Sequence, residues 1–541
     1  MKKVIALLLV LCMLGAVLIA CGKKNPDAKP TEKPTETEQP TDEMGQPALN
    51  TTKWYETLDF DGDSLRIMVL NDEKVRYEWE TEDPGDDELD QQIALRNEVV
   101  ESGLNLDVDI VLTQGSATGN SGAWQHGVWA TEFTEAIHND VNNKLHELDA
   151  VANFGFDGLN NDLREYYANL LDKDTFKYFN FKLPCWNQDI LENGTMNGQL
   201  YGMSGDMNLS LFNTALIIWQ NDDLYEQARN PEEDPENIQK LLLDGLWTFG
   251  ELYKWAKWAE AGAEVGSCAG NYGVSIQGDQ YSENPTECIP YAWQLDLIGT
   301  NPDGTHYYNF KNNDRAEQGL LNLVSLYKAE GNYWRIHGSN QDKTKQCKCG
   351  AGGHFVAGGV IFKGDVLYWD KAANRAIREM EDQYSLLCWP KYDENQTDYY
   401  TTSQNYFNHI SVLDHSGSPT PTKGDAVSAY FQYGTEYSYT YVRGYYFEKI
   451  VKLKFFGTDD STGRVTRSST IFVMIVDNLS FEFADIYTPA LSNVMKSVFK
   501  GAYKKAAGGN TPPTLQNEFE SNEDEYTAQL AALEQWFGLA Q

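Results

Sequence analysis

The segment Leu65-Arg66-Ile67-Met68-Val69-Leu70 predicts the first buried β-strand of the chain. Apolar residues then recur at helical spacing across residues 90–102, and Gly103 follows them as an expected C-terminal cap. A second strand is expected at Leu106-Asp107-Val108-Asp109-Ile110-Val111, and a third at residues 149–153. The order strand, helix, strand predicts a parallel α/β sheet.

The N-terminus has the pattern of an export signal. Met1-Lys2-Lys3 precedes an apolar run from Val4 to Ala20, which is typical of a secretory signal peptide. The run ends Leu18-Ile19-Ala20-Cys21-Gly22, which resembles the lipobox of bacterial lipoproteins. The alternative is a transmembrane anchor, because a span needs roughly 17–25 apolar residues. A cysteine at the cleavage position favours a signal peptide at 1–20, a lipid on Cys21 and a location on the extracytoplasmic face of the cell membrane.

The segment that follows has the composition of a tether. Residues 21–53 start with Cys21 and continue with Lys, Pro, Thr, Glu, Gln and Asp. Such a sequence buries too little apolar surface to offset the entropy of ordering, and its prolines keep it extended. We therefore expect a disordered linker that holds a folded module away from the membrane.

The composition limits the classes of partner. The chain has 541 residues, 41% hydrophobic and 13% aromatic, and a formal net charge of −37. A surface this negative repels nucleic acid, anionic lipid headgroups and anionic ligands. We expect a neutral or cationic ligand, no nucleic acid, no cofactor and a monomeric protein.

The cysteines leave their pairing open. After Cys12 and Cys21 are assigned to the signal and the lipid, six remain, an even number in an export context where disulfides can form. Cys347 and Cys349 with His354 invite a zinc hypothesis, but C-x-C lacks the usual spacing of zinc ligands. We expect structural cysteines and no metal site.

Further motifs occur in a fixed order. They are Asn197-Gly198-Gln199-Leu200-Tyr201-Gly202-Met203-Ser204-Gly205-Asp206, then residues 215–224 (ALIIWQNDDL), 246–252 (LWTFGEL), 355–362 (FVAGGVIF) and 387–392 (LCWPKY). In this order they resemble family 1 extracellular solute-binding proteins, which include the maltose-binding proteins. Thr248 is expected to cap a helix with support from Glu251.

The resemblance implies a two-lobed, periplasmic-binding-protein-like α/β fold of type II, with hinge-linked lobes and a ligand cleft between them. Lobe one is expected at 54–208 plus 405–455, and lobe two at 209–404 plus 456–541. The lobes are expected to close on the ligand by hinge motion.

Aromatic side chains are the expected sugar contacts, because their π-faces suit the C–H face of a sugar ring, and Asp and Asn suit its hydroxyl groups. Several fall where the family places such contacts. The candidate ligand-binding residues are Trp186, Trp369, Asp206, Asn153, Phe154, Trp293, Tyr487 and Trp124. Four tryptophans in strand or helix patterns are assigned to the core: Trp219, Trp255, Trp258 and Trp389.

These features predict a lipoprotein that binds a carbohydrate, an oligosaccharide in the first instance, and delivers it to the permease of an ABC importer. One alternative is a surface sugar sensor that signals to a membrane kinase. Another is a glycan-active enzyme, which needs two carboxylates about 5–9.5 Å apart. Many acidic residues make such a pair unavoidable, and the sequence has no Gly-x-Ser-x-Gly, His-Glu-x-x-His or phosphate-loop motif. The motif order therefore predicts a binding protein without catalytic residues.

Lipid attachment at Cys21 can be tested directly. The Cys21→Ala protein should lose incorporated palmitate and be released from the membrane or remain unprocessed, because the acyl chains provide the anchor. Metabolic labelling and membrane fractionation measure both effects. Tight membrane association of the Cys21→Ala protein would instead indicate a transmembrane anchor.

Overall fold

A computed structural model of the chain describes residues 49, 53–79, 88–113, 126–232, 236–265, 268–276, 284–334, 350–367, 377, 380–446, 464–507 and 514–539. In these residues the strands form a four-stranded sheet, a five-stranded sheet and a two-stranded hairpin. Residues 49–541 belong to one compact unit. Within the described residues, no helix has both the length and the apolar character needed to span a membrane.

The first sheet has the strand order β11-β3-β1-β2. Its strands are β1 (Asp63–Val69), β2 (Leu106–Leu112), β3 (Ala150–Phe154) and β11 (Asn408–Val412). The first three run parallel, with Ile67 beside both Ile110 and Ala150, and β11 runs antiparallel to β3. The predicted parallel sheet is confirmed, and its fourth strand comes from far along the sequence.

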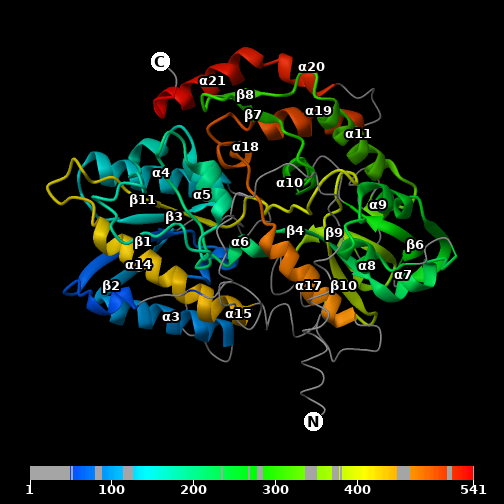
Figure 1. The fold of residues 1–541 in the computed structure, drawn as a ribbon, viewed down its shortest axis with the longest axis horizontal. Coiled ribbons are helices and arrows are strands. Elements are labelled where there is room, and N and C mark those ends of the chain that lie inside the picture. The colour runs from blue at the N-terminus through cyan, green and yellow to red at the C-terminus, as the bar shows by residue number, and fades with distance from the viewer. Residues whose placement is uncertain are drawn as a thin grey trace, which may run out of the picture. The chain divides into compact units, whose positions relative to one another are not determined.

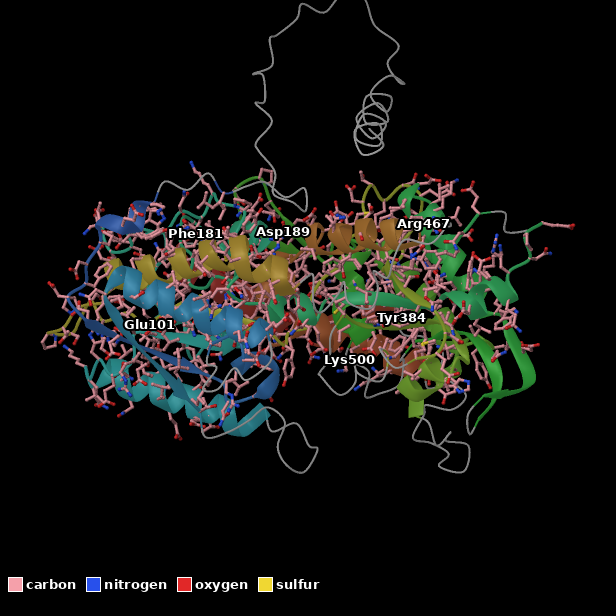
Figure 2. The ribbon with its side chains drawn as sticks, turned by 90° about the horizontal axis from the view of Figure 1, so that it is seen from below. Glu101, Phe181, Asp189, Tyr384, Arg467 and Lys500 are labelled. Atoms are coloured by element: carbon pink, nitrogen blue, oxygen red, sulfur yellow. The ribbon has the colours of Figure 1, made fainter. Side chains whose placement is uncertain are left out.

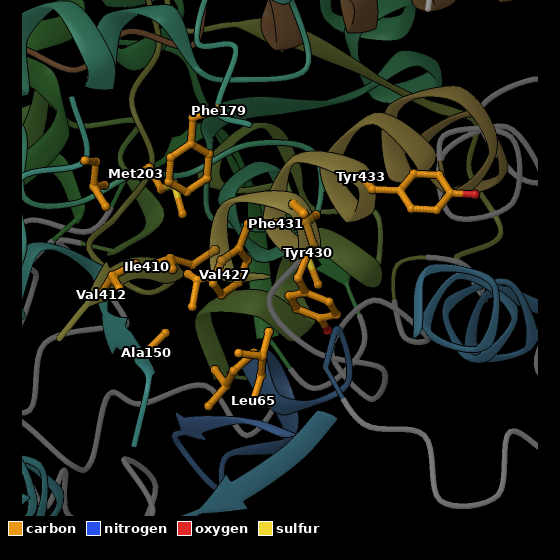
Figure 3. Close-up of a cluster of buried hydrophobic side chains, with 14 of the residues drawn as sticks. Leu65, Ala150, Phe179, Met203, Ile410, Val412, Val427, Tyr430, Phe431 and Tyr433 are labelled. Carbon is orange, nitrogen blue, oxygen red and sulfur yellow. The ribbon is translucent and has the colours of Figure 1, made fainter. Parts of the chain in front are cut away.

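Helices cover both faces of this sheet (Figure 1). They are α2 (Glu73–Arg76), α3 (Glu88–Leu104), α4 (His126–Asn142), α5 (Gln188–Gly194), α14 (Gly424–Tyr437) and α15 (Arg443–Tyr446). Figure 3 shows the core under α14, where Val427 and Phe431 meet Leu65, Ile410 and Val412 of the sheet. This core holds the first lobe together.

The second sheet has the order β10-β4-β9-β6-β5. Its strands are β4 (Leu216–Asn221), β5 (Ala259–Val265), β6 (Cys268–Ser275), β9 (Val360–Val366) and β10 (Tyr384–Cys388). Nearby helices are α7 (Asp222–Ala228), α8 (Ile238–Leu243), α9 (Phe249–Ala256), α10 (Asn284–Ala292), α11 (Asp314–Lys328), α12 (Gly350–Val356) and α17 (Arg464–Asp477). In Figure 2, Glu101 and Phe181 mark the first lobe, and Tyr384 and Arg467 mark the second.

The remaining elements are short or C-terminal. The hairpin pairs β7 (Ile298–Thr300) with β8 (His306–Tyr308). The crossing helix is α6 (Ser210–Asn213), and the C-terminal helices are α18 (Phe483–Ile486), α19 (Gly501–Ala507), α20 (Leu515–Glu520) and α21 (Glu523–Trp536). The expectation of an α/β chain with two lobes linked by crossing segments is thus confirmed.

Two local expectations need correction: the C-terminal cap at Gly103 is wrong, and Thr248 lies at the expected N-cap but lacks the expected capping bond. Gly103 lies inside α3, and Asn105, at φ 52°, is the left-handed residue that follows the helix. A Cβ on Gly103 would approach Tyr433 at 3.2 Å, so this glycine permits close packing against α14. Thr248 occupies the N-cap of α9 without a side-chain capping bond. The motif at residues 355–362 spans the end of α12 and the start of β9, which begins at Val360.

The tryptophans assigned to the core have two outcomes. Trp219, Trp255 and Trp389 are buried, as expected. Trp258 is only half-buried. The apolar patterns around the first three therefore predicted burial correctly.

Candidate functional site

In each sheet, the ends of several strands lie near the chain segments that connect the two sheets. In the first sheet the carboxyl ends of β1 and β3 share one edge, where antiparallel β11 begins. In the second, the end of β9 lies beside the start of β4, with Val366 opposite Leu216, and the end of β10 is close by, with Cys388 opposite Ile217. Ligands of α/β sheets bind outside the carboxyl ends of strands. The candidate site therefore comprises these two edges and the crossing segments.

The crossing segments form a short antiparallel ladder. The backbone N–H of Gln404 donates to the Thr214 carbonyl at 2.9 Å, and the N–H of Leu216 donates to the Thr402 carbonyl at 3.1 Å. Ala215 and Ser403 form the bridge between these bonds. A third segment joins through Ser480, whose N–H donates to the Thr401 carbonyl at 2.7 Å. Among the residues that the structure describes, the segments 214–216 and 401–404 therefore form the hinge that links the two lobes.

A buried carboxylate anchors the first crossing segment to the first lobe. Glu78 is fully buried and accepts hydrogen bonds from the Ser210 N–H at 2.7 Å and the Ser210 hydroxyl at 2.9 Å. The Asn408 amide also donates to this carboxylate. Burial raises the pKa of Glu78 to about 7, while the donors from Ser210 and Asn408 act in the opposite direction.

The end of α6 is fixed by a second contact set. The Asn213 amide donates to the Tyr77 hydroxyl at 3.0 Å, and the Tyr446 hydroxyl donates to the Asn213 side-chain oxygen. Tyr77 precedes Glu78, and Tyr446 ends α15. The first lobe therefore holds α6 over its whole length, and residues 214–216 beyond it bond to the second crossing segment.

An aromatic pair and a carboxylate lie at the carboxyl edge of the first sheet. The rings of Phe154 and Tyr406 meet edge to face with centroids 4.5 Å apart. Asp72 comes shortly after β1, and the pKa of Tyr406 is raised by burial and by the neighbouring Asp72 carboxylate. Each of these three side chains is 2% exposed. An aromatic surface beside a carboxylate is the chemistry that recognises a sugar ring.

Sequence reasoning found Phe154 but missed Asp72 and Tyr406. Asp72 follows a parallel strand, so the rule that ligands bind at carboxyl ends of strands could have identified it. Tyr406 precedes β11, and its place in the first sheet is set by pairing with β3. No local pattern indicates that pairing.

Asn153 and Asp206 are buried and bonded within the first lobe. The Asn153 amide donates to the Ser411 hydroxyl at 3.1 Å and its oxygen accepts from the Tyr167 hydroxyl at 3.3 Å. Asp206 lies 3.1 Å from an Arg443 guanidinium nitrogen. Burial raises the pKa of Asp206 to about 6, and Arg443 partly offsets that rise.

Three predicted aromatic contacts have interior surroundings. Trp186 donates its indole N–H to the Gln432 side chain at 3.1 Å, and Trp293 donates to the Pro390 carbonyl at 3.0 Å. The Tyr487 hydroxyl donates to the Gly194 carbonyl at 2.5 Å. All three are at most 2% exposed. Their role as ligand contacts stays a prediction.

The other predicted residues lie outside the described residues. Trp124 and Trp369 are among them, as is Cys21, the predicted lipidation site. The ligand role of Trp369 and Trp124 also stays a prediction.

The described cysteines include buried, unbonded thiols at Cys185 and Cys388. Cys347 and Cys349 lie outside the described residues, so their pairing and the zinc hypothesis are untested. The His354 ring nitrogen Nε2 is 3.0 Å from the Gly270 carbonyl oxygen. Across the described residues, no group of three or more His, Cys, Asp or Glu side chains has a metal-binding arrangement.

No protein-family model matches the chain, and no curated protein sequence matches it. Three solved structures illustrate the structural likeness. The first is the GacH receptor of Streptomyces glaucescens, solved unliganded and with acarbose, at 11% identity and TM-score 0.47 over 86% of this chain and 99% of that one. The second is an ABC transporter solute-binding protein of Thermotoga lettingae with α-D-tagatose. It is 13% identical with a TM-score of 0.47, over 87% of this chain and 100% of that one. The third is the maltose–maltodextrin-binding protein of Alicyclobacillus acidocaldarius. It is 12% identical with a TM-score of 0.44, over 86% of this chain and 100% of that one.

The burial of Trp186 predicts its effect on stability. Trp186→Ala should lower the free energy of unfolding by about 3–5 kcal/mol, because it leaves a cavity in a packed core. Trp186→Phe, which keeps most of the ring, should lose much less. Urea denaturation measures both. A Trp186→Ala protein as stable as wild type would favour the original prediction of a ligand contact.

Glu78 predicts a pH-dependent stability. Its folded pKa of about 7 exceeds the ordinary value of 4.5, so the folded state retains a proton that the unfolded state releases. This contribution is complete below the unfolded pKa and is lost as the pH rises through the folded one. Between about pH 5 and about pH 8, wild-type stability should therefore fall more than that of Glu78→Gln.

Urea denaturation across this pH range tests the expectation. The matched control is Glu98→Gln, a change at an exposed position on α3, which should follow wild type. Parallel stability curves for wild type and Glu78→Gln would contradict the proton linkage.

Proposed function

We propose that this protein is an extracytoplasmic lipoprotein that binds a neutral carbohydrate between its lobes and delivers it to the permease of an ABC importer. The observation that carries the proposal is the hydrogen-bonded ladder of residues 214–216 and 402–404 between two α/β sheets. Short crossing segments absorb the dihedral changes of hinge closure. The motif order of the sequence supports the same function.

The chemistry of the first-sheet edge supports a carbohydrate ligand. Phe154 and Tyr406 supply aromatic faces, and Asp72 supplies a carboxylate that can accept hydrogen bonds from sugar hydroxyls. The net charge of −37 disfavours an anionic ligand. A neutral sugar is compatible with all three side chains.

Ligand access to this edge requires movement. Asp72, Phe154 and Tyr406 are each 2% exposed, so a sugar reaches them only when neighbouring segments separate. A ligand that contacts both lobes would then favour the closed arrangement by its differential affinity for the two states. The permease would then distinguish the ligand-bound protein from the free protein by its closed arrangement.

The contacts of the buried carboxylates favour binding over catalysis. Glu78 is held by Ser210 and Asn408, and Asp206 is paired with Arg443. Glu78 anchors the first crossing segment and Asp206 is bonded within the first lobe, so each has a structural partner in this arrangement. Turnover of a glycan by the purified protein would revive the enzyme hypothesis.

A glycan panel screened by calorimetry on residues 50–541 tests the proposal. For the best glycan, Asp72→Asn should weaken binding about 10–100-fold and Tyr406→Phe about 3–10-fold, because each change removes a polar group from the proposed contact. The sequence further predicts that Trp369→Ala weakens binding about 5–150-fold. Tyr430→Phe, a change in the first-lobe core, is the matched control.

The binding glycan should also reduce the radius of gyration measured by small-angle scattering, because closure brings the lobes together. Absence of binding by every glycan would sink the proposed function. Wild-type affinity in the Asp72, Tyr406 and Trp369 variants would instead show that the sugar binds elsewhere.

A further inference from the structure

The C-terminal helix α21 contacts the hairpin β7–β8. The backbone N–H of His306 in β8 donates to the Glu534 carboxylate. The Tyr308 hydroxyl donates to the Tyr526 carbonyl at 3.3 Å. Both acceptors lie on α21, so this helix packs alongside the hairpin, as Figure 1 also shows.

The hairpin is part of the second lobe. The N–H of Asn309, just after β8, donates to the Leu297 carbonyl at 2.9 Å. Nearby, Trp293 packs edge to face on Phe249 of α9 and donates to the Pro390 carbonyl after β10. Contacts between α21 and the hairpin are therefore contacts with the second lobe.

The far end of α21 contacts a different part of the chain. The Phe537 carbonyl accepts hydrogen bonds from the Asn197 amide at 2.8 Å and the Gln199 amide at 3.2 Å. The ring of Trp536 lies against that of Tyr201, with centroids 4.6 Å apart. These partners come from the Asn197–Asp206 motif that identified the family resemblance.

That motif belongs to the first lobe. The N–H of Leu170 donates to the Leu200 carbonyl at 2.8 Å, and Met203 forms a backbone bridge with Ile410 of β11. Leu200 and Met203 are members of the first-lobe core. Helix α21 and Phe537, the residue after it, thus contact both lobes at a place far in sequence from the crossing ladder.

Helix α18 adds to this junction. His306 stacks on Phe483 with centroids 3.8 Å apart, and Tyr487 packs edge to face on Phe537 at 5.7 Å. The Tyr487 hydroxyl donates to the Gly194 carbonyl of the first lobe. The aromatic groups of α18 therefore lie between the hairpin and the end of α21.

We propose that residues 523–537 form a strap across the two lobes, and that its contacts with Asn197, Gln199 and Tyr201 limit how readily the lobes separate. The proposal rests on the proposed function, in which lobe separation admits the ligand. Two neutral hydrogen bonds, the contacts of the Tyr201 ring with Trp536 and Phe537, and the Arg164 guanidinium 5.1 Å from the Trp536 ring centroid each contribute modestly. Such a strap can be released, so it biases opening without preventing it.

The test removes some of the contacts that the strap makes with the first lobe. Asn197→Gly is suitable because Asn197 has φ 47°, a left-handed conformation that glycine tolerates. One variant combines Asn197→Gly with Gln199→Ala. A second variant combines Asn197→Gly with Trp536→Ala. The matched control is Gln535→Ala, a change at an exposed residue of α21 beside Trp536.

Without ligand, the strap variants should have a larger radius of gyration than wild type by small-angle scattering. Amides of residues 197–203 should exchange with deuterium about tenfold faster, because local opening becomes easier. Gln535→Ala should match wild type in both measurements. The Asn197→Gly/Gln199→Ala variant leaves every aromatic side chain of the junction in place, so it remains informative if the Trp536→Ala protein fails to fold.

Adding maltotriose and raffinose as probes separates this proposal from the proposed function. Expansion of the ligand-free strap variants supports the strap even if neither sugar compacts any protein. If a sugar compacts wild type while the folded Asn197→Gly/Gln199→Ala variant has the wild-type radius and exchange rates, the strap is wrong and sugar binding stands.

Discussion

The structure depends on the backbone hydrogen bonds between residues 214–216 and 402–404. Both segments leave one lobe and enter the other within a few residues, since β4 begins at Leu216 and β11 begins at Asn408. Because these short segments are hydrogen-bonded to each other, they hold the two lobes at a fixed position along the crossing. Any rotation of one lobe relative to the other must therefore be absorbed by the dihedral angles of these residues.

Buried polar contacts decide which part of the crossing can bend. Glu78 holds Ser210 at the start of α6, and Tyr77 and Tyr446 hold Asn213 at its end. A buried carboxylate is stable only with such donors, because the interior does not solvate its charge as water does. Helix α6 consequently moves with the first lobe, and the hinge lies beyond it.

The edge of the first sheet connects this hinge to ligand chemistry. Phe154, Tyr406 and Asp72 meet there because β3, β11 and β1 are neighbours in the sheet. In the proposed function, their burial makes ligand access depend on lobe separation. In that function, the hinge, the proposed strap and the proposed sugar contacts would act on one equilibrium between open and closed arrangements.

The sequence by itself determined the α/β class, the three parallel strands of the first sheet and their order, because periodicity and turn residues are local properties. It did not determine the end of α3, where Gly103 serves packing against Tyr433 and Asn105 takes the left-handed conformation. Nor did it show that Trp186 lies in the core or that Glu78 anchors the crossing. Burial and hydrogen-bond partners depend on residues hundreds of positions away, such as Gln432 and Asn408, so only the tertiary structure decided them.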